Sequence, residues 1–163
     1  MNIFALSSGR GPSGIAIIRL SGESSLEISK KITQLDKIQE NIVNFCKFYN
    51  PKNNKIIDPE ALMIWFAKPN SYTGEDLAEF HVHGSNAVIN SLLRLLSEQE
   101  NCRLAEPGEF TKIAFQNGKL DLVKAESIGD LINAETEMQR HQAIKIMTGR
   151  KPKPQGYLGC YWW

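Results

Sequence analysis

A glycine-rich loop at residues 8–14 separates two segments, residues 2–7 and 15–20, in which apolar and β-branched residues dominate. This composition predicts two β-strands. Within the loop, Gly-Arg-Gly-Pro-Ser-Gly matches the GxGxxG pattern of dinucleotide-binding proteins. In those proteins the loop opens a helix whose N–H groups face a pyrophosphate, whereas here a strand follows and Pro12 has no N–H donor. The pattern therefore indicates a loop that joins two strands or approaches a ligand, and it argues against a dinucleotide site.

Further strand-like segments are separated by polar turns. Residues 42–49 and 61–67 are predicted strands, and the Asn- and Lys-rich residues 50–55 between them predict a hairpin. Residues 77–83 predict another strand, which ends at Gly84.

Helical spacing of apolar residues appears in four places. Ser24 and Glu27 have the spacing of a capping box before a short helix, and Ser85 is an N-cap candidate for a second helix. Residues 110–116 predict a third, short helix. From residue 120 to about 147 the apolar spacing continues, which predicts one long helix and the beginning of an all-helical unit.

Size and charge limit the function classes. With 163 residues the chain has room for one domain, or for one domain and a fragment of a second. Residues 1–144 carry 15 basic and 18 acidic side chains, whereas residues 145–163 carry four basic and no acidic ones. The body is therefore a poor candidate for binding nucleic acid by charge neutralisation alone.

The apolar runs are far shorter than the ~20 residues of a membrane helix, so we expect no membrane insertion and a cytoplasmic location. Three cysteines, Cys46, Cys102 and Cys160, form no CxxC pair, which predicts reduced thiols. Residues 149–163 differ in composition from the rest and contain two prolines that prevent helix continuation. We interpret this tail as a tag or a frameshifted end, although a natural tail is an alternative.

Two patterns of side chains suggest a site. Glu79, His81 and His83 alternate along a predicted strand, so they share a face on which two imidazoles and a carboxylate could bind a metal. Alternatively, these histidines are hydrogen-bonded residues with a structural role or a role in a site without a metal. Arg19, Glu79 and Lys119 are charged residues next to apolar or turn residues, and together they would form a mixed-charge pocket. The sequence contains neither the GxxxxGK[ST] pattern of a P-loop nor the GxSxG pattern of a serine hydrolase.

Several motifs occur in an order and spacing that resemble those of one family, the N-terminal part of the tRNA-modifying GTPases called MnmE or TrmE, which act on wobble uridine (U34). The resemblance covers about residues 2–148. It rests on residues 17–22 (IIRLSG), 69–76 (PNSYTGED) with Glu79 and His83-Gly84, 104–112 (LAEPGEFTK) with Ala114-Phe115, 117–122 (NGKLDL) with Ala125-Glu126, and 130–134 (DLINA).

The resemblance implies an α+β fold, with a mixed sheet and flanking helices similar to the tetrahydrofolate-binding domain of the glycine-cleavage aminomethyltransferase. We expect a folate-binding and dimerising N-terminal domain at residues 1–118. The first part of a truncated helical domain would follow at residues 119–148, before the tail at residues 149–163.

The resemblance also places the family's folate contacts on Arg19, Glu79 and Lys119. The expected cofactor is 5-formyl- or 5,10-methylene-tetrahydrofolate. A carboxylate can accept the N–H and the exocyclic amine of a pterin side by side, and cations attract the glutamate tail and the carbonyls. We therefore assign Glu79 to the pterin edge, and Arg19 and Lys119 to tail or carbonyl oxygens. No catalytic residue and no metal ligand is assigned.

In the full-length family, the one-carbon unit of the folate serves the formation of carboxymethylaminomethyl-uridine together with an FAD-dependent partner, MnmG. GTP, Mg²⁺ and K⁺ belong to a GTPase domain that this chain does not contain, and tRNA is an indirect partner. We expect a homodimer that is inactive alone. It lacks the family's C-terminal Cys-x-Gly-Lys motif, whose lysine also reaches the folate.

Two other functions are compatible with these motifs. One is a non-catalytic dimerising fragment, or a pseudogene product, that no longer binds folate. The other is a stand-alone folate-dependent methyltransferase-like protein, against which the absence of a visible nucleophile argues. In addition, an amphipathic helix at residues 120–147 without its partners would expose apolar residues and favour self-association.

Overall fold

The computed structural model describes residues 1–9 and 11–149. These residues form two compact units, of which the first is Met1–Lys119 and the second begins at Leu120. Most of the sequence-defined tail, residues 150–163, lies outside the described residues, and its interpretation stays a prediction.

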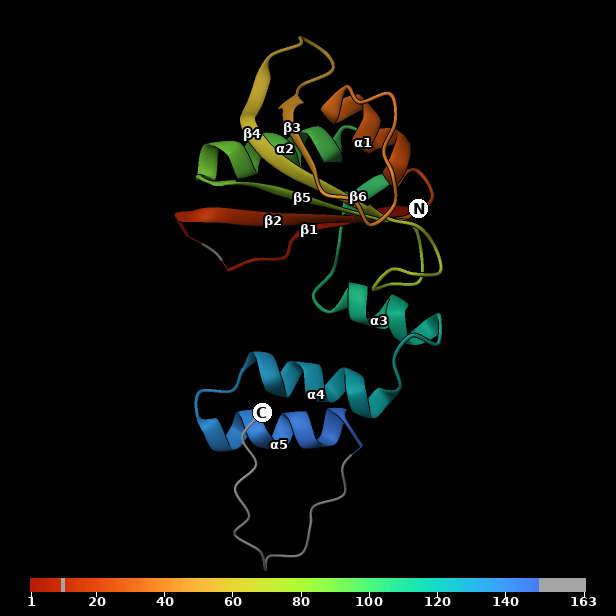
Figure 1. Ribbon diagram of the computed structural model, residues 1–163, viewed down its shortest axis with the longest axis vertical. Coiled ribbons are helices and arrows are strands. Elements are labelled where there is room, and N and C mark those ends of the chain that lie inside the picture. Colours follow the sequence, from red (N-terminus) through yellow and green to blue (C-terminus); the bar gives the residue numbers. More distant parts are fainter. Residues whose placement is uncertain (10, 150–163) are drawn as a thin grey trace, which may run out of the picture. The chain divides into compact units, whose positions relative to one another are not determined.

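A six-stranded mixed sheet forms the centre of the first unit (Figure 1). The strand order is β3-β4-β5-β2-β1-β6, and neighbours are antiparallel except β1 and β6, which are parallel. The strands are β1 (Asn2–Leu6), β2 (Ser13–Ser21), β3 (Asn44–Tyr49), β4 (Ile56–Phe66), β5 (Leu77–Gly84) and β6 (Cys102–Leu104). The α+β class and the five predicted strands are confirmed, and β6 is an additional strand.

Strand β4 begins five residues earlier than the sequence predicts. Its first part contains Pro59, which weakens a strand prediction because proline cannot donate to a ladder. The structure accommodates Pro59 at an irregularity of the β3–β4 pairing, where the register shifts between Cys46–Ala61 and Phe48–Asp58. One extra residue in β4 at this point leaves Pro59 outside the regular ladder.

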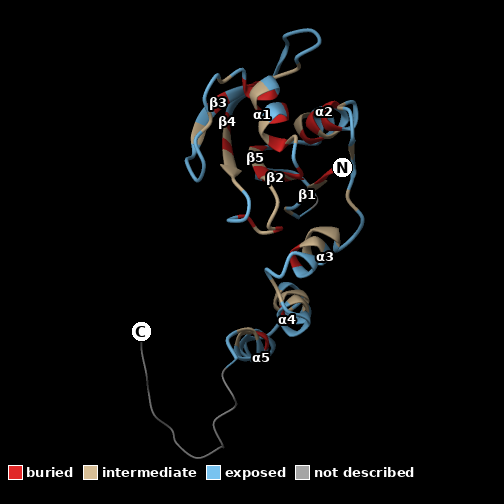
Figure 2. Ribbon diagram, turned by 90° about the vertical axis from the view of Figure 1, so that its right-hand side faces the viewer, coloured by how far each residue is buried: buried red, intermediate tan, exposed pale blue. Residues whose placement is uncertain are grey.

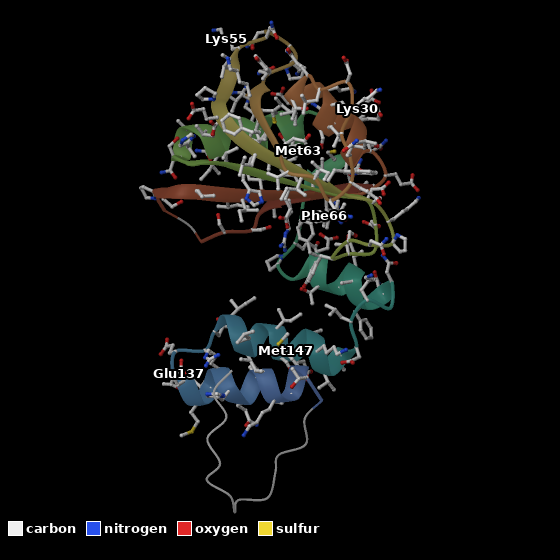
Figure 3. All side chains as sticks on the ribbon, in the orientation of Figure 1. Lys30, Lys55, Met63, Phe66, Glu137 and Met147 are labelled. Carbon is white, nitrogen blue, oxygen red and sulfur yellow. The ribbon has the colours of Figure 1, made fainter. Side chains whose placement is uncertain are left out.

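Helices α1 (Ser25–Thr33) and α2 (Asn86–Ser97) cover one face of the sheet (Figure 1). Residues are buried where these helices meet the strands (Figure 2). Figure 3 labels Met63, which belongs to this core. The core consists chiefly of Phe4, Ile18, Leu20, Ile28, Ile32, Phe48, Met63, Phe80, Leu92 and Leu96. At its centre the rings of Phe48 and Phe80 meet edge to face, with centroids 5.6 Å apart.

One of the two predicted helix caps forms. The hydroxyl of Ser85 accepts a hydrogen bond from the N–H of Val88 at 3.2 Å, as an N-cap does. The capping box predicted at Ser24 is wrong, because the Ser24 side chain makes no cap hydrogen bond. Instead, the side chain of Glu27 accepts from the ammonium of Lys30 at 3.3 Å, so it does not turn back to the cap.

Helix α3 (Glu109–Gln116) belongs to the first unit and lies on the side of the sheet opposite to α1 and α2 (Figure 1). Its first residue, Glu109, is bound by the guanidinium of Arg103 in β6, with one N–O distance of 2.8 Å. The same carboxylate accepts from the N–H of Glu106 at 2.8 Å. The Arg103 hydrogen bond and the Glu106 N–H lower the pKa of Glu109 to about 2, so this link to the sheet edge stays ionised at neutral pH.

The single long helix predicted for residues 120–147 is wrong. The second unit contains two helices, α4 (Leu122–Ile132) and α5 (Glu137–Met147); Figure 3 labels Glu137 and Met147 at the two ends of α5. The helix is interrupted because a new one starts at Thr136, where Thr136 and Gln139 form a capping box. Each of the two side chains binds the other residue's backbone N–H, at 3.3 and 3.0 Å. Local capping therefore competes successfully with the continuing apolar periodicity.

Exposed apolar side chains occur on both helices of the second unit, as the amphipathic pattern predicts. They are Leu122, Val123, Ile132, Met138 and Ile146. None of the described helices is long and apolar enough to cross a bilayer. Cys46 and Cys102 carry free thiols, and burial raises the pKa of Cys46 to about 11.

The Phe48–Phe80 contact generates a stability prediction. We expect Phe80→Ala to lower the free energy of unfolding by about 3–5 kcal/mol, because it leaves a cavity in a fully buried layer. Urea denaturation followed by circular dichroism measures this change. Ile42→Ala, at a residue that is half exposed, should change the free energy by less than about 1 kcal/mol. Equal losses in both variants would contradict the assigned core.

Candidate functional site

Arg19 and Glu79 face each other across the two central strands. They are directly paired in the antiparallel register of β2 and β5. Their neighbours along the strands, including Ile18 and Phe80, point into the helix-covered core, so the alternation of a strand places Arg19 and Glu79 on the other face. The Arg19 Nε atom donates to Glu79 Oε1 at 2.8 Å. The sequence-predicted pair is therefore brought together.

An aromatic ring lies beside this ion pair. The guanidinium carbon of Arg19 is 5.4 Å from the centroid of the Tyr72 ring, a cation–π arrangement. The Tyr72 hydroxyl is 2.9 Å from the hydroxyl of Thr111 in α3, which fixes the ring. Sequence reasoning did not assign Tyr72 to the site. The SYTGED motif contains it, but its contact with Arg19 spans 53 positions of the chain and depends on the fold.

The loop that carries Tyr72 is fastened to the sheet by hydroxyl groups. Ser21, at the end of β2, lies 2.8 Å from the hydroxyl of Thr73 and donates to Glu75 Oε2 at 3.0 Å. Within the loop, the Ser71 hydroxyl donates to the Glu75 carbonyl. Ser21, Ser71 and Thr73 are buried, so these hydrogen bonds satisfy hydroxyls that water does not reach. The loop is thereby held over the same sheet face as Arg19 and Glu79.

Lys119 reaches the opposite end of this loop. Its ammonium donates to the carbonyl of Pro69 at 2.9 Å, and it makes no ion pair with Glu79 within the described part of the chain. Asn117, two residues earlier, donates through its side chain to the Thr73 carbonyl at 2.8 Å. Lys119 thus borders the same loop, but it does not touch the Arg19–Glu79 pair.

The Arg19–Glu79 pair leaves binding capacity on the sheet face. Their side chains are 32 % and 15 % exposed. Arg19 uses its Nε donor for Glu79, and a guanidinium has four further N–H donors. Glu79 Oε2 lies 3.3 Å from Nε2 of His81, a long contact that leaves acceptor capacity. The arrangement offers a carboxylate to a ligand with adjacent N–H groups, and cations to a ligand's anionic or carbonyl groups.

The three residues of the ExHxH pattern do not converge on one point. His81 contacts Glu79, whereas Nδ1 of His83 lies 2.9 Å from Oδ1 of Asp58. Asp58 is fully buried and also accepts from the backbone N–H of His83 at 2.8 Å. Among residues 1–9 and 11–149, no group of three or more His, Cys, Asp or Glu side chains has the arrangement of a metal site. The hydrogen-bonded interpretation of the histidines fits this geometry, and sequence reasoning missed Asp58.

Arg19, Glu79 and Lys119 do not line any of three hollows in the first unit. A groove of about 680 Å³ lies between the β3–β4 hairpin and α2, and one of about 690 Å³ lies beside the end of β1 and the start of α3. A hollow of about 240 Å³ lies on the sheet face near Ile15, Phe45 and His83. The candidate site is therefore defined by its charged side chains and the fastened loop beside them, and not by one of these three hollows.

Comparison with known proteins gives this fold and site a class. A family model described as the N-terminus of the GTP-binding protein TrmE matches residues 2–119. This domain is thus of the kind found at the start of such GTP-binding proteins, and the chain belongs to the TrmE N-terminal family, as the sequence motifs predicted.

Curated relatives agree with this assignment. The chain is 54 % identical to the tRNA modification GTPase MnmE of Pelagibacter ubique over 92 % of this chain and 34 % of that protein. It is 47 % identical to MnmE of Brucella canis, over 93 % and 34 %. It is 43 % identical to the mitochondrial tRNA modification GTPase gtpbp3 of Dictyostelium discoideum, over 90 % and 30 %. The chain spans about a third of the length of these relatives.

The backbone at Gly74 generates a prediction about the loop. Its φ of +78° favours glycine, and an added Cβ would lie 3.1 Å from Asn117 Cβ and 3.2 Å from Lys119 Cγ. We expect Gly74→Ala to lower the free energy of unfolding by about 1–3 kcal/mol and to displace Lys119. Urea denaturation measures the loss, and the chemical shifts of Lys119 report the displacement.

Gly14→Ala is the matched control, because an added Cβ there meets nothing within 4 Å. It should leave the Lys119 signals unchanged. If Gly74→Ala also leaves stability and these signals unchanged, the close approach of the loop to Lys119 is wrong.

Proposed function

We propose that this chain binds a tetrahydrofolate derivative and forms the folate-binding, dimerising N-terminal part of a tRNA-modifying GTPase. Membership of the TrmE N-terminal family supports the proposed role in tRNA modification, since the relatives are named tRNA modification GTPases. The observation that carries the folate proposal is the Arg19–Glu79 pair on the sheet face opposite α1 and α2, next to a fastened loop that Lys119 borders. The proposed likeness to the folate domain of the aminomethyltransferase rests on membership of the TrmE N-terminal family.

The residues present suit the chemistry of a folate. Glu79 would accept the ring N–H and the exocyclic amine of the pterin, and Arg19 would shift part of its bonding from Glu79 to a ligand oxygen. Tyr72 adds an aromatic surface beside Arg19. Lys119 would attract a carboxylate of the glutamate tail through donors that Pro69 does not use. When bound, 5-formyl- or 5,10-methylene-tetrahydrofolate would supply the one-carbon unit for modification of the wobble uridine.

We assign GTP, the metal ions and the FAD-dependent chemistry of the family's reaction to regions or partners other than this chain. This sequence contains no P-loop pattern, so GTP, Mg²⁺ and K⁺ would bind to other regions of full-length family members. An FAD-dependent partner like MnmG would act with the full-length protein, and tRNA would be reached through that complex. We therefore propose that this chain binds folate without completing the reaction alone.

The proposed dimer would cover exposed apolar residues of the sheet face. Ile15 in β2 is 63 % exposed and Phe45 in β3 is 71 % exposed, and both line the same hollow. A large aromatic side chain with this exposure is a typical component of a protein interface. Burial against a second copy would remove both side chains from water.

Calorimetric titration with 5-formyltetrahydrofolate tests the folate site. We expect Glu79→Gln to weaken binding by about 10-fold or more, because it removes a charge-assisted acceptor of the pterin edge. Lys119→Ala should weaken binding through the loss of a cation. Glu100→Gln, at an exposed residue, is the control and should bind like the wild type.

Circular dichroism confirms that each variant is folded. If folded wild-type protein does not bind 5-formyltetrahydrofolate, the folate proposal fails and the non-catalytic dimerising fragment becomes the better function.

Sedimentation velocity at tens of micromolar tests the dimer, in a concentration range near ordinary dimer affinities. We expect a wild-type dimer and a shift of Phe45→Asp towards monomer, because the charge would be buried in the interface. Leu104→Asp, at a residue that is 61 % exposed in β6, should remain dimeric. A monomeric wild type would contradict the proposed interface.

A further inference from the structure

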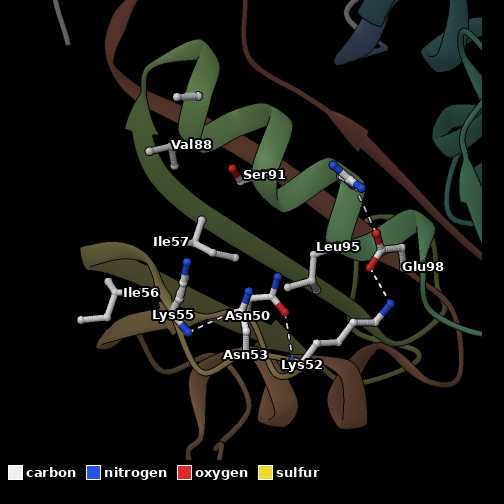
Figure 4. Close-up of a pocket in the computed structure, with 12 residues that line it drawn as sticks. Asn50, Lys52, Asn53, Lys55, Ile56, Ile57, Val88, Ser91, Leu95 and Glu98 are labelled. Atoms are coloured by element: carbon white, nitrogen blue, oxygen red, sulfur yellow. Dashed lines mark hydrogen bonds and ion pairs between the residues drawn. The ribbon is translucent and has the colours of Figure 1, made fainter.

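The groove between the β3–β4 hairpin and α2 collects cations from two distant parts of the sequence (Figure 4). Lys52 and Lys55 lie on the hairpin turn, and Arg94 lies on α2. Its volume is about 680 Å³. The first 119 residues carry equal numbers of basic and acidic side chains, so three cations against the single carboxylate of Glu98 make this groove a local basic excess.

Glu98 orders two of these cations without exhausting their donors. Its carboxylate lies 2.8 Å from the ammonium of Lys52 and 3.3 Å from Nε of Arg94. The hydrogen bond from Lys52 and the positive charge of that lysine, with a smaller contribution from Arg94, lower the pKa of Glu98 and favour its ionised form. An ammonium has three N–H donors and a guanidinium five, so both cations retain donors for a ligand. Lys55 has no ion-pair partner in the described part of the chain.

The side-chain amides of Asn50 and Asn53 add neutral hydrogen-bond donors to the groove. The side-chain oxygen of Asn50 accepts from the N–H of Lys52 at 2.9 Å, and that of Asn53 accepts from the N–H of Lys55 at 3.0 Å. Because the amide oxygens are used within the turn, the two NH₂ groups remain as donors. Apart from Glu98, the groove therefore presents donors, and the matching ligand is a group that only accepts, such as a phosphate diester.

We propose that this groove binds the sugar–phosphate backbone of an RNA strand. The inference rests on the proposed role in tRNA modification, and it adds a contact surface distinct from the folate site. Ile56, which is half exposed, and Val88, which is partly buried, provide apolar surface in the groove for sugars or bases. Helix α2 covers the opposite face of the sheet from Arg19 and Glu79, so RNA and folate would not compete.

The charge of the rest of the domain sets the strength of this contact. Because there is no basic excess outside the groove, binding should be weak and salt-sensitive, and it should orient an RNA strand that a larger assembly holds.

Fluorescence anisotropy with a labelled anticodon stem–loop RNA tests the proposal in low salt. The variant with Lys52→Ala, Lys55→Ala and Arg94→Ala should bind at least about 10-fold more weakly, and the slope of log affinity against log salt should fall in magnitude by about 2. Lys31→Ala, an exposed lysine of α1, is the control for a general loss of charge. Glu98→Gln should strengthen RNA binding several-fold, whereas Glu100→Gln should do so far less.

Equal effects in the groove and control variants would overturn the proposal. Binding of inorganic phosphate in the groove without any RNA binding would overturn the assignment to RNA. Titration of the groove variants with 5-formyltetrahydrofolate separates the two sites, because folate affinity should be unchanged. RNA binding that persists in a protein without folate binding would leave the groove intact and remove only the folate proposal.

Discussion

The antiparallel pairing of β2 with β5 is the constraint on which the rest of the first unit depends. One face of the pair is apolar, with Ile18 and Phe80 in the core under α1 and α2. The other face carries Arg19 opposite Glu79. A shift of β2 by one residue against β5 would turn Arg19 into the core and would turn Ile18 and Leu20 to the surface. Core burial therefore fixes the position of the ion pair.

The fastened loop and α3 depend on the same register. Ser21, the last residue of β2, is the hydroxyl that holds Thr73 and Glu75 in place. Tyr72 then lies against Arg19, and its hydroxyl meets Thr111 of α3. Asn117 and Lys119 after α3 return to the loop at Thr73 and Pro69. Long-range hydrogen bonds and strand pairing thus bring four segments together in one charged surface: β2, β5, the loop at residues 69–76, and α3 with the residues that follow it.

Much of the fold could be predicted from local patterns, and the exceptions have physical causes. The start of α2 could be predicted from Ser85, because an N-cap depends on residues that are close in the sequence. The break between α4 and α5 was missed because the apolar spacing continues through Thr136, although its capping box with Gln139 is also local. Pro59 concealed the first half of β4, since the irregular pairing with β3 that tolerates it is not visible in the sequence.

The candidate site shows the same division. Arg19 and Glu79 could be singled out as charges within apolar strands, and their pairing followed once the strands were adjacent. The contact of Tyr72 with Arg19, the burial of Asp58 beneath His83 and the convergence of Lys55 with Arg94 depend on tertiary structure. Residues that are far apart in the sequence and have unremarkable neighbours leave no local signal. For this reason the hairpin groove could not be predicted, and the charge balance of the body even argued against an RNA contact.

The central claim is that the charged sheet face beneath the fastened loop holds a folate. A crystal structure of the protein with 5-formyltetrahydrofolate tests this claim most directly. The account predicts the pterin edge within about 3 Å of the Glu79 carboxylate, at hydrogen-bonding distance, with ligand oxygens near Arg19 and Lys119. A folate bound elsewhere, with the Arg19–Glu79 pair unchanged and out of its reach, would contradict the account.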